Sequence, residues 1–186
     1  DILVVNGAVQ TIEAERQAND PFPLHQPKLL LRNAGNGRLE DATGRGGAAL
    51  QLSDVSRGAA FGDVDNDGDT DVLVANNSGK ARLLVNTVGN RNHWVGLRLV
   101  GAPLGSAGRD MLGARVAVTR EDATRLWRRA RSDASYASAN DPRVLVGLGQ
   151  SSKPVRVRVI WPGGATEEWD NVAVDRYTTL NEGTGK

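Results

Sequence analysis

Short apolar runs separated by polar turn residues recur through the first half of the chain. They are Ile2–Val5, Leu29–Leu31, Val72–Ala75 and Leu83–Val85. Continuous runs of this kind are typical of buried β-strands. The dipeptide Asn36-Gly37 follows the second run and predicts a hairpin, because both turn positions of the favoured hairpin type need positive φ. Weak apolar periodicity over Thr11–Asn19 indicates one or two helical turns.

Apolar and polar residues alternate in several segments of the second half. The apolar series are Val95, Leu97 and Leu99; Val116 and Val118; and Val155, Val157 and Val159. A period of two is typical of a half-buried antiparallel strand, with one face on a core and the other in water. About six such segments within residues 91–186 favour a small antiparallel β-sandwich.

The first half also repeats itself. Residues 1–6 (Asp-Ile-Leu-Val-Val-Asn) match residues 71–76 (Asp-Val-Leu-Val-Ala-Asn), and Leu30–Asn33 matches Leu83–Asn86. The offsets of 70 and 53 residues leave about 17 extra residues in the first copy, around Ala14–Lys28. Two matching blocks in the same order favour stacked β units, such as propeller blades, over chance similarity between strand-rich segments.

These patterns predict an all-β chain in two parts that meet near Asn90. Residues 1–90 are expected to form the C-terminal blade or blades of a β-propeller, and residues 91–186 the sandwich. Charge changes at the same place: residues 1–90 hold 8 Lys and Arg against 12 Asp and Glu, whereas residues 91–186 hold 15 against 10. Solvated loops alone would also account for this asymmetry.

Composition excludes several classes of site. The 186 residues include no Cys, which excludes disulfides, thiolate metal sites and cysteine nucleophiles, and only two His, His25 and His93. No apolar run approaches the roughly 18 residues that a membrane-spanning helix needs. No spacing indicates a catalytic triad or an acid–base pair, so we expect a protein that is not an enzyme.

The sharpest chemical feature is the acidic loop, residues 63–71, with the sequence Asp-Val-Asp-Asn-Asp-Gly-Asp-Thr-Asp. Without a cation, its carboxylates would repel one another at short range. Calcium takes six to eight oxygen ligands in a flexible geometry, and Gly68 permits the sharp turn that such a loop needs. The predicted ligands are the side-chain oxygens of Asp63, Asp65, Asp67 and Asp71 and the backbone carbonyl of Asp69.

Other interpretations of the loop fit less well. An EF-hand loop that begins at Asp63 would place a bidentate Glu at its twelfth residue, where the chain has Val74. Both flanks are strand-like, so the loop is expected to bridge two β-strands and not two helices. Magnesium demands a stricter octahedral geometry than calcium. A solvated acidic turn without a metal is the remaining alternative.

The segment Gly58–Asp71, followed by Leu83–Asn86, resembles an FG-GAP (VCBS-type) propeller repeat. In that family the aspartate loop binds calcium between the first two strands of a blade. The resemblance therefore implies Ca2+ ligation by Asp63, Asp65, Asp67, Asp69 and Asp71. Asp1 resembles the last aspartate of a preceding loop.

The second half resembles the ASPIC/UnbV domain, which follows such repeats in the cartilage acidic protein family. The matching stretches are Gly113–Val116, Ser135-Tyr136, Asn140–Arg143, Gly147–Gly149, Trp161–Gly164 and Tyr177–Leu180. Ala137 and Ala139 depart from the Leu and Gln that this family tends to carry. Together the resemblances imply a non-catalytic, calcium-binding adhesion or scaffold module that is secreted, on the cell surface or periplasmic. Its expected partners are a protein or cell surface, other propeller blades, or a second copy.

A basic strand face offers an alternative function. Arg125, Trp127, Arg129 and Arg131 are expected on one side of a strand, with Leu126 and Ala130 opposite. Such a face suits a carbohydrate or a polyanion. It also suits a solvated face on which arginine stems pack Trp127. Nucleic acid is a poor candidate, because the acidic loop would repel it.

Overall fold

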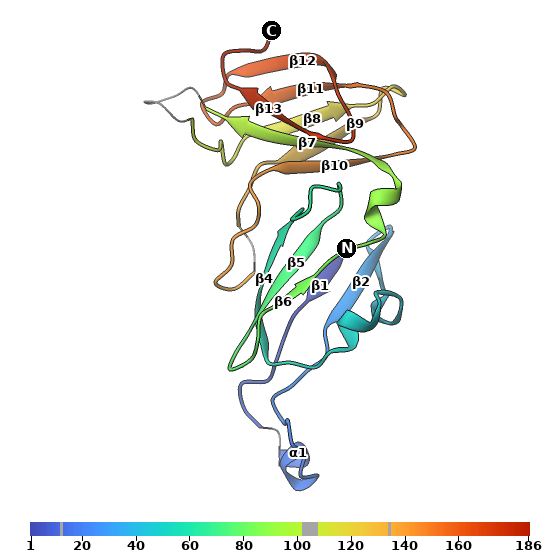
Figure 1. The fold of residues 1–186 in the computed structure, drawn as a ribbon, viewed down its shortest axis with the longest axis vertical. Coiled ribbons are helices and arrows are strands. Elements are labelled where there is room, and N and C mark those ends of the chain that lie inside the picture. The colour runs from blue at the N-terminus through green and yellow to red at the C-terminus, as the bar shows by residue number, and fades with distance from the viewer. Residues whose placement is uncertain (12, 102–107, 134) are drawn as a thin grey trace. The chain divides into compact units, whose positions relative to one another are not determined.

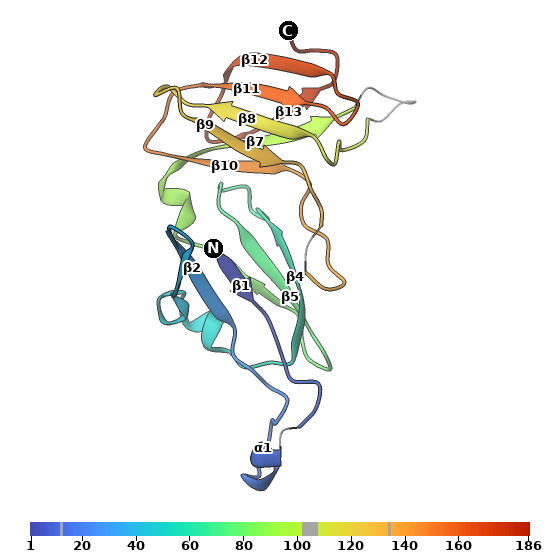
Figure 2. The ribbon, with the colours of Figure 1, turned by 180° about the vertical axis from the view of Figure 1, so that it is seen from behind.

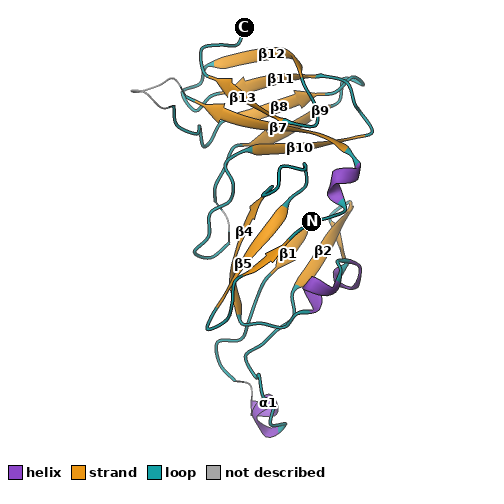
Figure 3. Ribbon diagram, in the orientation of Figure 1, coloured by secondary structure: helices purple, strands orange, loops and turns teal. Residues whose placement is uncertain are grey.

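The computed structural model describes residues 1–11, 13–101, 108–133 and 135–186. Nearly all regular structure in these residues is β-strand (Figure 3). The helical segments are α1 (Glu13–Gln17) and the 3-10 turns η1 (Thr43–Arg45), η2 (Ala48–Gln51) and η3 (Gly89–Arg91). The prediction of an all-β chain is confirmed. None of the described helices has the length and apolar character needed to cross a membrane.

The chain forms two compact units, and each draws segments from both sides of Asn90. Unit 1 comprises Asp1–Ala60, Val72–Leu84 and Ala134–Ser138. Unit 2 comprises Phe61–Asp71, Val85–Asp133 and Ala139–Lys186. The acidic loop therefore belongs to unit 2, although most of each flanking strand belongs to unit 1.

Unit 1 is built from two small sheets, with strand orders β1–β2–β3 and β4–β5–β6 (Figure 1). The strands are β1 (Ile2–Val4), β2 (Leu29–Gly35), β3 (Arg38–Asp41), β4 (Ser56–Gly62), β5 (Asp71–Asn76) and β6 (Arg82–Leu84). The predicted hairpin forms between β2 and β3, with Asn36 at φ 50° and Gly37 at φ 73°. The extra residues of the first repeat copy form α1 and its flanking connections, between β1 and β2.

The two copies of the repeat make the same local contacts. In the first, β1 pairs antiparallel with β2, and the Asp1 carboxylate accepts a hydrogen bond of 2.7 Å from the backbone N–H of Asn33. In the second, β5 pairs antiparallel with β6, and the Asp71 carboxylate accepts one of 2.8 Å from Asn86. Both asparagines then accept a hydrogen bond from the N–H two residues on. The sequence match thus corresponds to a repeated structure.

A buried ion pair in unit 1 links Lys28, just before β2, to Asp54, which lies before β4. The ammonium group of Lys28 is fully buried and donates to the carbonyl of Leu52 and to the Asp54 carboxylate. Arg82 binds the same carboxylate through two N–H groups, at 2.7 and 2.9 Å. The Arg82 guanidinium, helped by Lys28, outweighs the effect of burial and holds the pKa of Asp54 below its usual value.

Unit 2 contains the sheets β10–β7–β13 and β12–β11–β8–β9 (Figures 1 and 2). The strands are β7 (His93–Val100), β8 (Arg115–Thr119), β9 (Arg125–Arg129), β10 (Val144–Gly149), β11 (Val155–Ile160), β12 (Thr166–Val172) and β13 (Tyr177–Asn181). Both sheets send alternate side chains into one shared core, which includes Val95, Leu97, Val116, Val146 and Val157. The period-two pattern of the sequence therefore identified core positions correctly.

One strand pair departs from the predicted antiparallel arrangement. β13 runs parallel to β7, with Tyr177 opposite Gly96 and Leu180 opposite Leu99. The reason is topological: the chain forms β8 to β12 before it returns, and a connection of that length permits parallel pairing. Gly96 is required where the strands meet, because a Cβ there would lie 2.3 Å from the Tyr177 ring.

Candidate functional site

The acidic loop brings three carboxylates together. One oxygen from each of Asp63, Asp65 and Asp71 lies within 4.8 Å of the others. Asp63 and Asp71 are buried, whereas Asp65 is exposed. Desolvation and the negative charges of Asp67, Asp71 and Asp63 raise the pKa of Asp65 above its usual value. This is the electrostatic pattern of a site in which a cation would relieve repulsion.

Backbone N–H groups hold the loop in shape. The two oxygens of Asp63 accept from the N–H groups of Asp67 and Gly68, at 3.1 and 3.0 Å. Asp71 closes the loop by accepting from Val64 at 3.0 Å. Asp67 accepts from the N–H of Asp69 at 3.1 Å and from the side-chain amide of Asn90 at 2.6 Å. The side chain of Asp67 is therefore engaged by protein donors, outside the group of three.

Asp69 is the unusual member of the loop. The residue is only 4% exposed, and neither carboxylate oxygen has a donor in hydrogen-bond geometry among the described residues. Burial raises its pKa to about 6, and the neighbouring charge of Asp67 adds to this. The backbone N–H of Asn90, which is near the carboxylate but outside that geometry, partly opposes the shift. An unpaired buried carboxylate is costly, so the loop as folded fits a bound cation.

Gly68 is fixed by its backbone and by its surroundings. It has φ 93°, in the region that favours glycine. A Cβ built at this position would lie 2.0 Å from Nε1 of Trp94, which is buried on β7. The turn of the loop therefore rests directly against an indole ring of the same unit.

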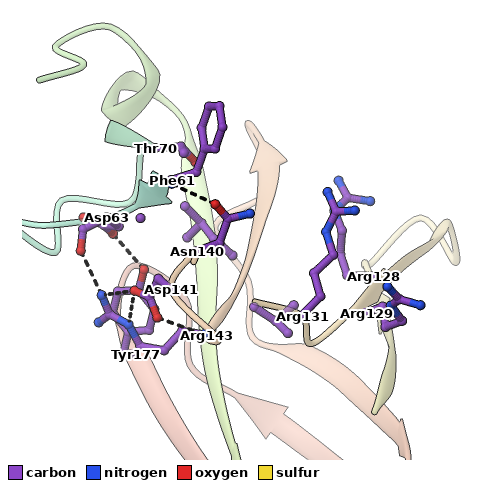
Figure 4. A pocket seen from close by; sticks show the side chains of 13 residues that line it. Phe61, Asp63, Thr70, Arg128, Arg129, Arg131, Asn140, Asp141, Arg143 and Tyr177 are labelled. Atoms are coloured by element: carbon purple, nitrogen blue, oxygen red, sulfur yellow. Dashed lines mark hydrogen bonds and ion pairs between the residues drawn. The ribbon is translucent and has the colours of Figure 1, made fainter. Parts of the chain in front are cut away.

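Two residues far along the sequence clamp the start of the loop (Figure 4). The hydroxyl of Tyr177 donates to the Asp63 carboxylate at 2.9 Å, and Arg143 donates to the Asp63 carbonyl at 2.8 Å. Arg143 also donates to the Asn66 side chain at 2.7 Å, binds Asp141 and lies 3.9 Å above the Tyr177 ring. Burial, reinforced by the Asp63 hydrogen bond, raises the pKa of Tyr177, so it stays a donor.

The sequence missed these supporting residues, because nothing near the loop signals them. Tyr177 and Arg143 lie in stretches that matched a family pattern without an assigned role. The only local hint was the segment Asn140–Arg143, which is mostly polar and lies immediately before β10. Asn140 accepts from the N–H of Phe61 at 2.9 Å and so anchors the strand that leads into the loop.

The predicted basic face is only partly a strand face. Arg125, Trp127 and Arg129 lie on β9 and are exposed, whereas Arg131 lies beyond the end of the strand. Arg129 and Arg131 both approach Asp133, at 3.4 and 3.8 Å. Opposite them, Leu126 is half-buried and Ala130 is buried, as the alternation predicted.

Comparison with known proteins gives one match. A family model described as ASPIC and UnbV matches residues 105–186, which is less than half of the chain. No curated protein matches the chain. The predicted resemblance of the second half is thus confirmed over residues 105–186, and the propeller-repeat resemblance of residues 1–90 stays a prediction.

Proposed function

We propose that the chain is a non-catalytic calcium-binding module that mediates interaction with a protein or a surface outside the cytoplasm. The observation that carries the metal assignment is the convergence of carboxylate oxygens from Asp63, Asp65 and Asp71, to which the buried Asp69 adds further negative charge in the same loop. An all-oxygen donor set suits a hard cation, and the loop offers no nitrogen or sulfur ligand.

Calcium fits this loop better than magnesium does. The oxygens come from a flexible mixture of exposed and buried carboxylates, and the backbone carbonyl of Asp69 is available as a further ligand. Magnesium would retain several waters in an octahedral shell. Extracellular calcium suits a single loop of modest affinity, which agrees with a secreted, cell-surface or periplasmic location. We further propose that residues 1–90 are the end of a propeller and that unit 2 is a β-sandwich.

Calcium titration of the whole chain tests the metal assignment. At a hundredfold excess over Kd, calcium should stabilise the folded protein by about 2.7 kcal/mol, and chelator should reverse this. Terbium provides a direct signal, because the Trp94 ring against Gly68 can sensitise its emission. Asp71→Asn should abolish both effects, whereas Asp122→Asn, at an exposed carboxylate of the same unit, should leave them intact. An unchanged melting temperature in chelator would contradict the proposal.

Exposed apolar strands in unit 1 support the interaction role. Ile2, Leu29, Leu39, Leu73 and Leu83 are all at least 38% exposed on the two small sheets. β1 and β3 end the first sheet, and β6 ends the second, so these strands can offer edges to a partner strand. β4, at the other end of the second sheet, is partly covered, because Phe61 donates to Asn140 and accepts from Asp141. Such surfaces attract a partner strand or a second copy.

We expect self-association that depends on this apolar surface. Leu73 and Leu83 lie opposite each other on β5 and β6, so Leu73→Lys with Leu83→Glu retains a favourable cross-strand pair while removing the apolar contact. Light scattering should show the parent as oligomers and this variant shifted toward monomer. Leu112→Lys, at an equally exposed position of unit 2, serves as the control. A parent that stays monomeric at high concentration would refute the expectation.

A further inference from the structure

A cavity of about 170 Å³ lies within unit 2, beside the acidic loop. Arg128, Arg129 and Arg131 line one side of it, and Asp141, Arg143 and Tyr177 line the other (Figure 4). Neither Arg125 nor Trp127 lines it. The cavity therefore shares Arg129 and Arg131 with the predicted basic face and adds Arg128.

Arg128 lies at an unusual position for an arginine. In the β8–β9 register it is opposite Val116, which is fully buried in the core, so Arg128 occupies an inward-facing position of the sheet. It remains exposed because β9 is the last strand of the sheet, and its side chain lines the cavity. An arginine at a core-facing position needs a reason beyond solubility, since an aliphatic residue would extend the core.

The charges around the cavity are unbalanced. Arg143 is neutralised by Asp141, to which it donates at 2.7 Å. Arg129 and Arg131 share the single carboxylate of Asp133. Among the described residues Arg128 has no carboxylate partner, and its guanidinium donates only to the neighbouring carbonyl of Trp127. The arginine side of the cavity therefore keeps an excess of positive charge.

The cavity is smaller than the roughly 300–1,000 Å³ of pockets that enclose a drug-sized ligand. The Asn140 amide, which also lines the cavity, is occupied: its oxygen accepts from the N–H of Phe61 and its nitrogen donates to the carbonyl of Asp133. Those bonds tie the segment that carries Arg131 and Asp133 to the strand that enters the acidic loop. Arg128, Arg129 and Arg131 are the cationic groups that face the cavity without a full counter-charge, and the volume suits a single functional group.

We propose that this cavity binds one oxyanion group, a sulfate or a carboxylate, through the guanidinium groups of Arg128 and Arg131. Guanidinium groups match the geometry of such oxygens and form charge-assisted hydrogen bonds with them. The cations of the site belong to the chain, and Asp63, a predicted calcium ligand, also lines the cavity. The group is either a free ion or part of an anionic glycan whose remainder stays in solvent.

Nitrogen-15 NMR titration of the whole chain tests the site. The probes are sodium sulfate, sodium acetate, a sulfated heparin disaccharide and its desulfated form, all at constant ionic strength set with chloride. Sulfate or the sulfated disaccharide should shift the amides of Phe61 and Val144, which line the cavity. Arg128→Gln with Arg131→Gln should weaken binding at least tenfold, and Arg128→Lys with Arg131→Lys should recover part of it. Arg125→Gln, on the same strand but outside the cavity, is the matched control.

Each outcome decides the proposal. Binding by sulfate alone assigns a free ion, and binding by the sulfated disaccharide alone assigns a glycan; both support an oxyanion site. Equal loss in Arg125→Gln, or the absence of shifts with all four probes, would overturn it. Equal binding of acetate or of the desulfated disaccharide, which keeps its uronate carboxylate, would assign the carboxylate as the bound group. If the double Gln variant binds the probes normally but self-associates, Arg128 instead protects the sheet edge, as inward-facing charges do on edge strands.

Discussion

Valine in place of Gly68 should abolish calcium binding and destabilise the protein by roughly 2–6 kcal/mol. Two independent effects add. A β-branched residue at φ 93° is strained, and its Cβ would overlap the Trp94 indole, 2.0 Å from Nε1. The indole cannot move freely, because it packs edge-on against Tyr177 with ring centroids 5.2 Å apart. Thermal unfolding with and without calcium, together with terbium emission, measures both losses.

Gly164→Val separates the two effects. Gly164 has φ 92°, but no atom lies within 4 Å of the position that its Cβ would take. This control should show the backbone strain alone and retain calcium binding. If Gly68→Val and Gly164→Val lose equal stability, the overlap with Trp94 adds nothing to the free energy of unfolding, and that part of the interpretation is wrong.

Two aspartate variants complete the series. Asp67→Ala should weaken calcium binding by removing a carboxylate that organises the loop through Asp69 and Asn90. Asp69→Asn should matter less for binding, because the expected ligand there is the backbone carbonyl. In chelator it should raise the melting temperature, since it removes a buried, unpaired charge. A loss of affinity in Asp69→Asn as large as in Asp67→Ala would assign the side chain as a ligand.

Asn in place of Asp54 should cost unit 1 about 3–5 kcal/mol, because it leaves the fully buried ammonium group of Lys28 without a counter-charge. Lys28→Met should cost much less, since Asp54 keeps both hydrogen bonds to Arg82. Urea unfolding of the two variants measures the difference. Equal losses would show that the Asp54 charge does not compensate the buried ammonium group of Lys28, and would contradict this interpretation.

The same ion pair makes the stability of unit 1 depend on pH in the acid range. The pKa of Asp54 is lowered in the folded state, chiefly by Arg82, so the folded protein binds its proton less tightly than the unfolded chain does. The stabilisation is therefore complete above the unfolded pKa and is lost as pH falls through the lower, folded pKa. Asp54→Asn should flatten this part of the stability profile.

Local spacing was sufficient to predict the parts of the site that lie within one segment. The alternating aspartates of residues 63–71 identified the acidic loop. In the same way, Asn36-Gly37 identified the hairpin between β2 and β3. In both cases the chemistry and the geometry depend only on neighbouring residues. The supporting residues were not predictable in this way. Tyr177 and Arg143 reach Asp63 only because β13 and β10 flank β7 in one sheet, and that order depends on tertiary pairing.

The arginine prediction failed to include Arg128 for a related reason. Strict alternation puts Arg128 on the same side as Leu126 and Ala130, opposite the predicted basic face. Alternation does not show that this strand, β9, ends its sheet. A long side chain at an inward position can then leave the core at the open edge. Periodicity gives the face of a strand but not its place in the sheet.

The parallel pairing of β13 with β7 has a consequence for biosynthesis. The contact order of the site is high, since the hydrogen bond from Tyr177 to Asp63 joins residues 114 positions apart. The ribosome releases the acidic loop well before it releases the strand that clamps this loop, and contacts of long range form late in folding. During synthesis the loop therefore depends on its own backbone donors, and the tyrosine clamp is added only when the last strand of the unit has emerged.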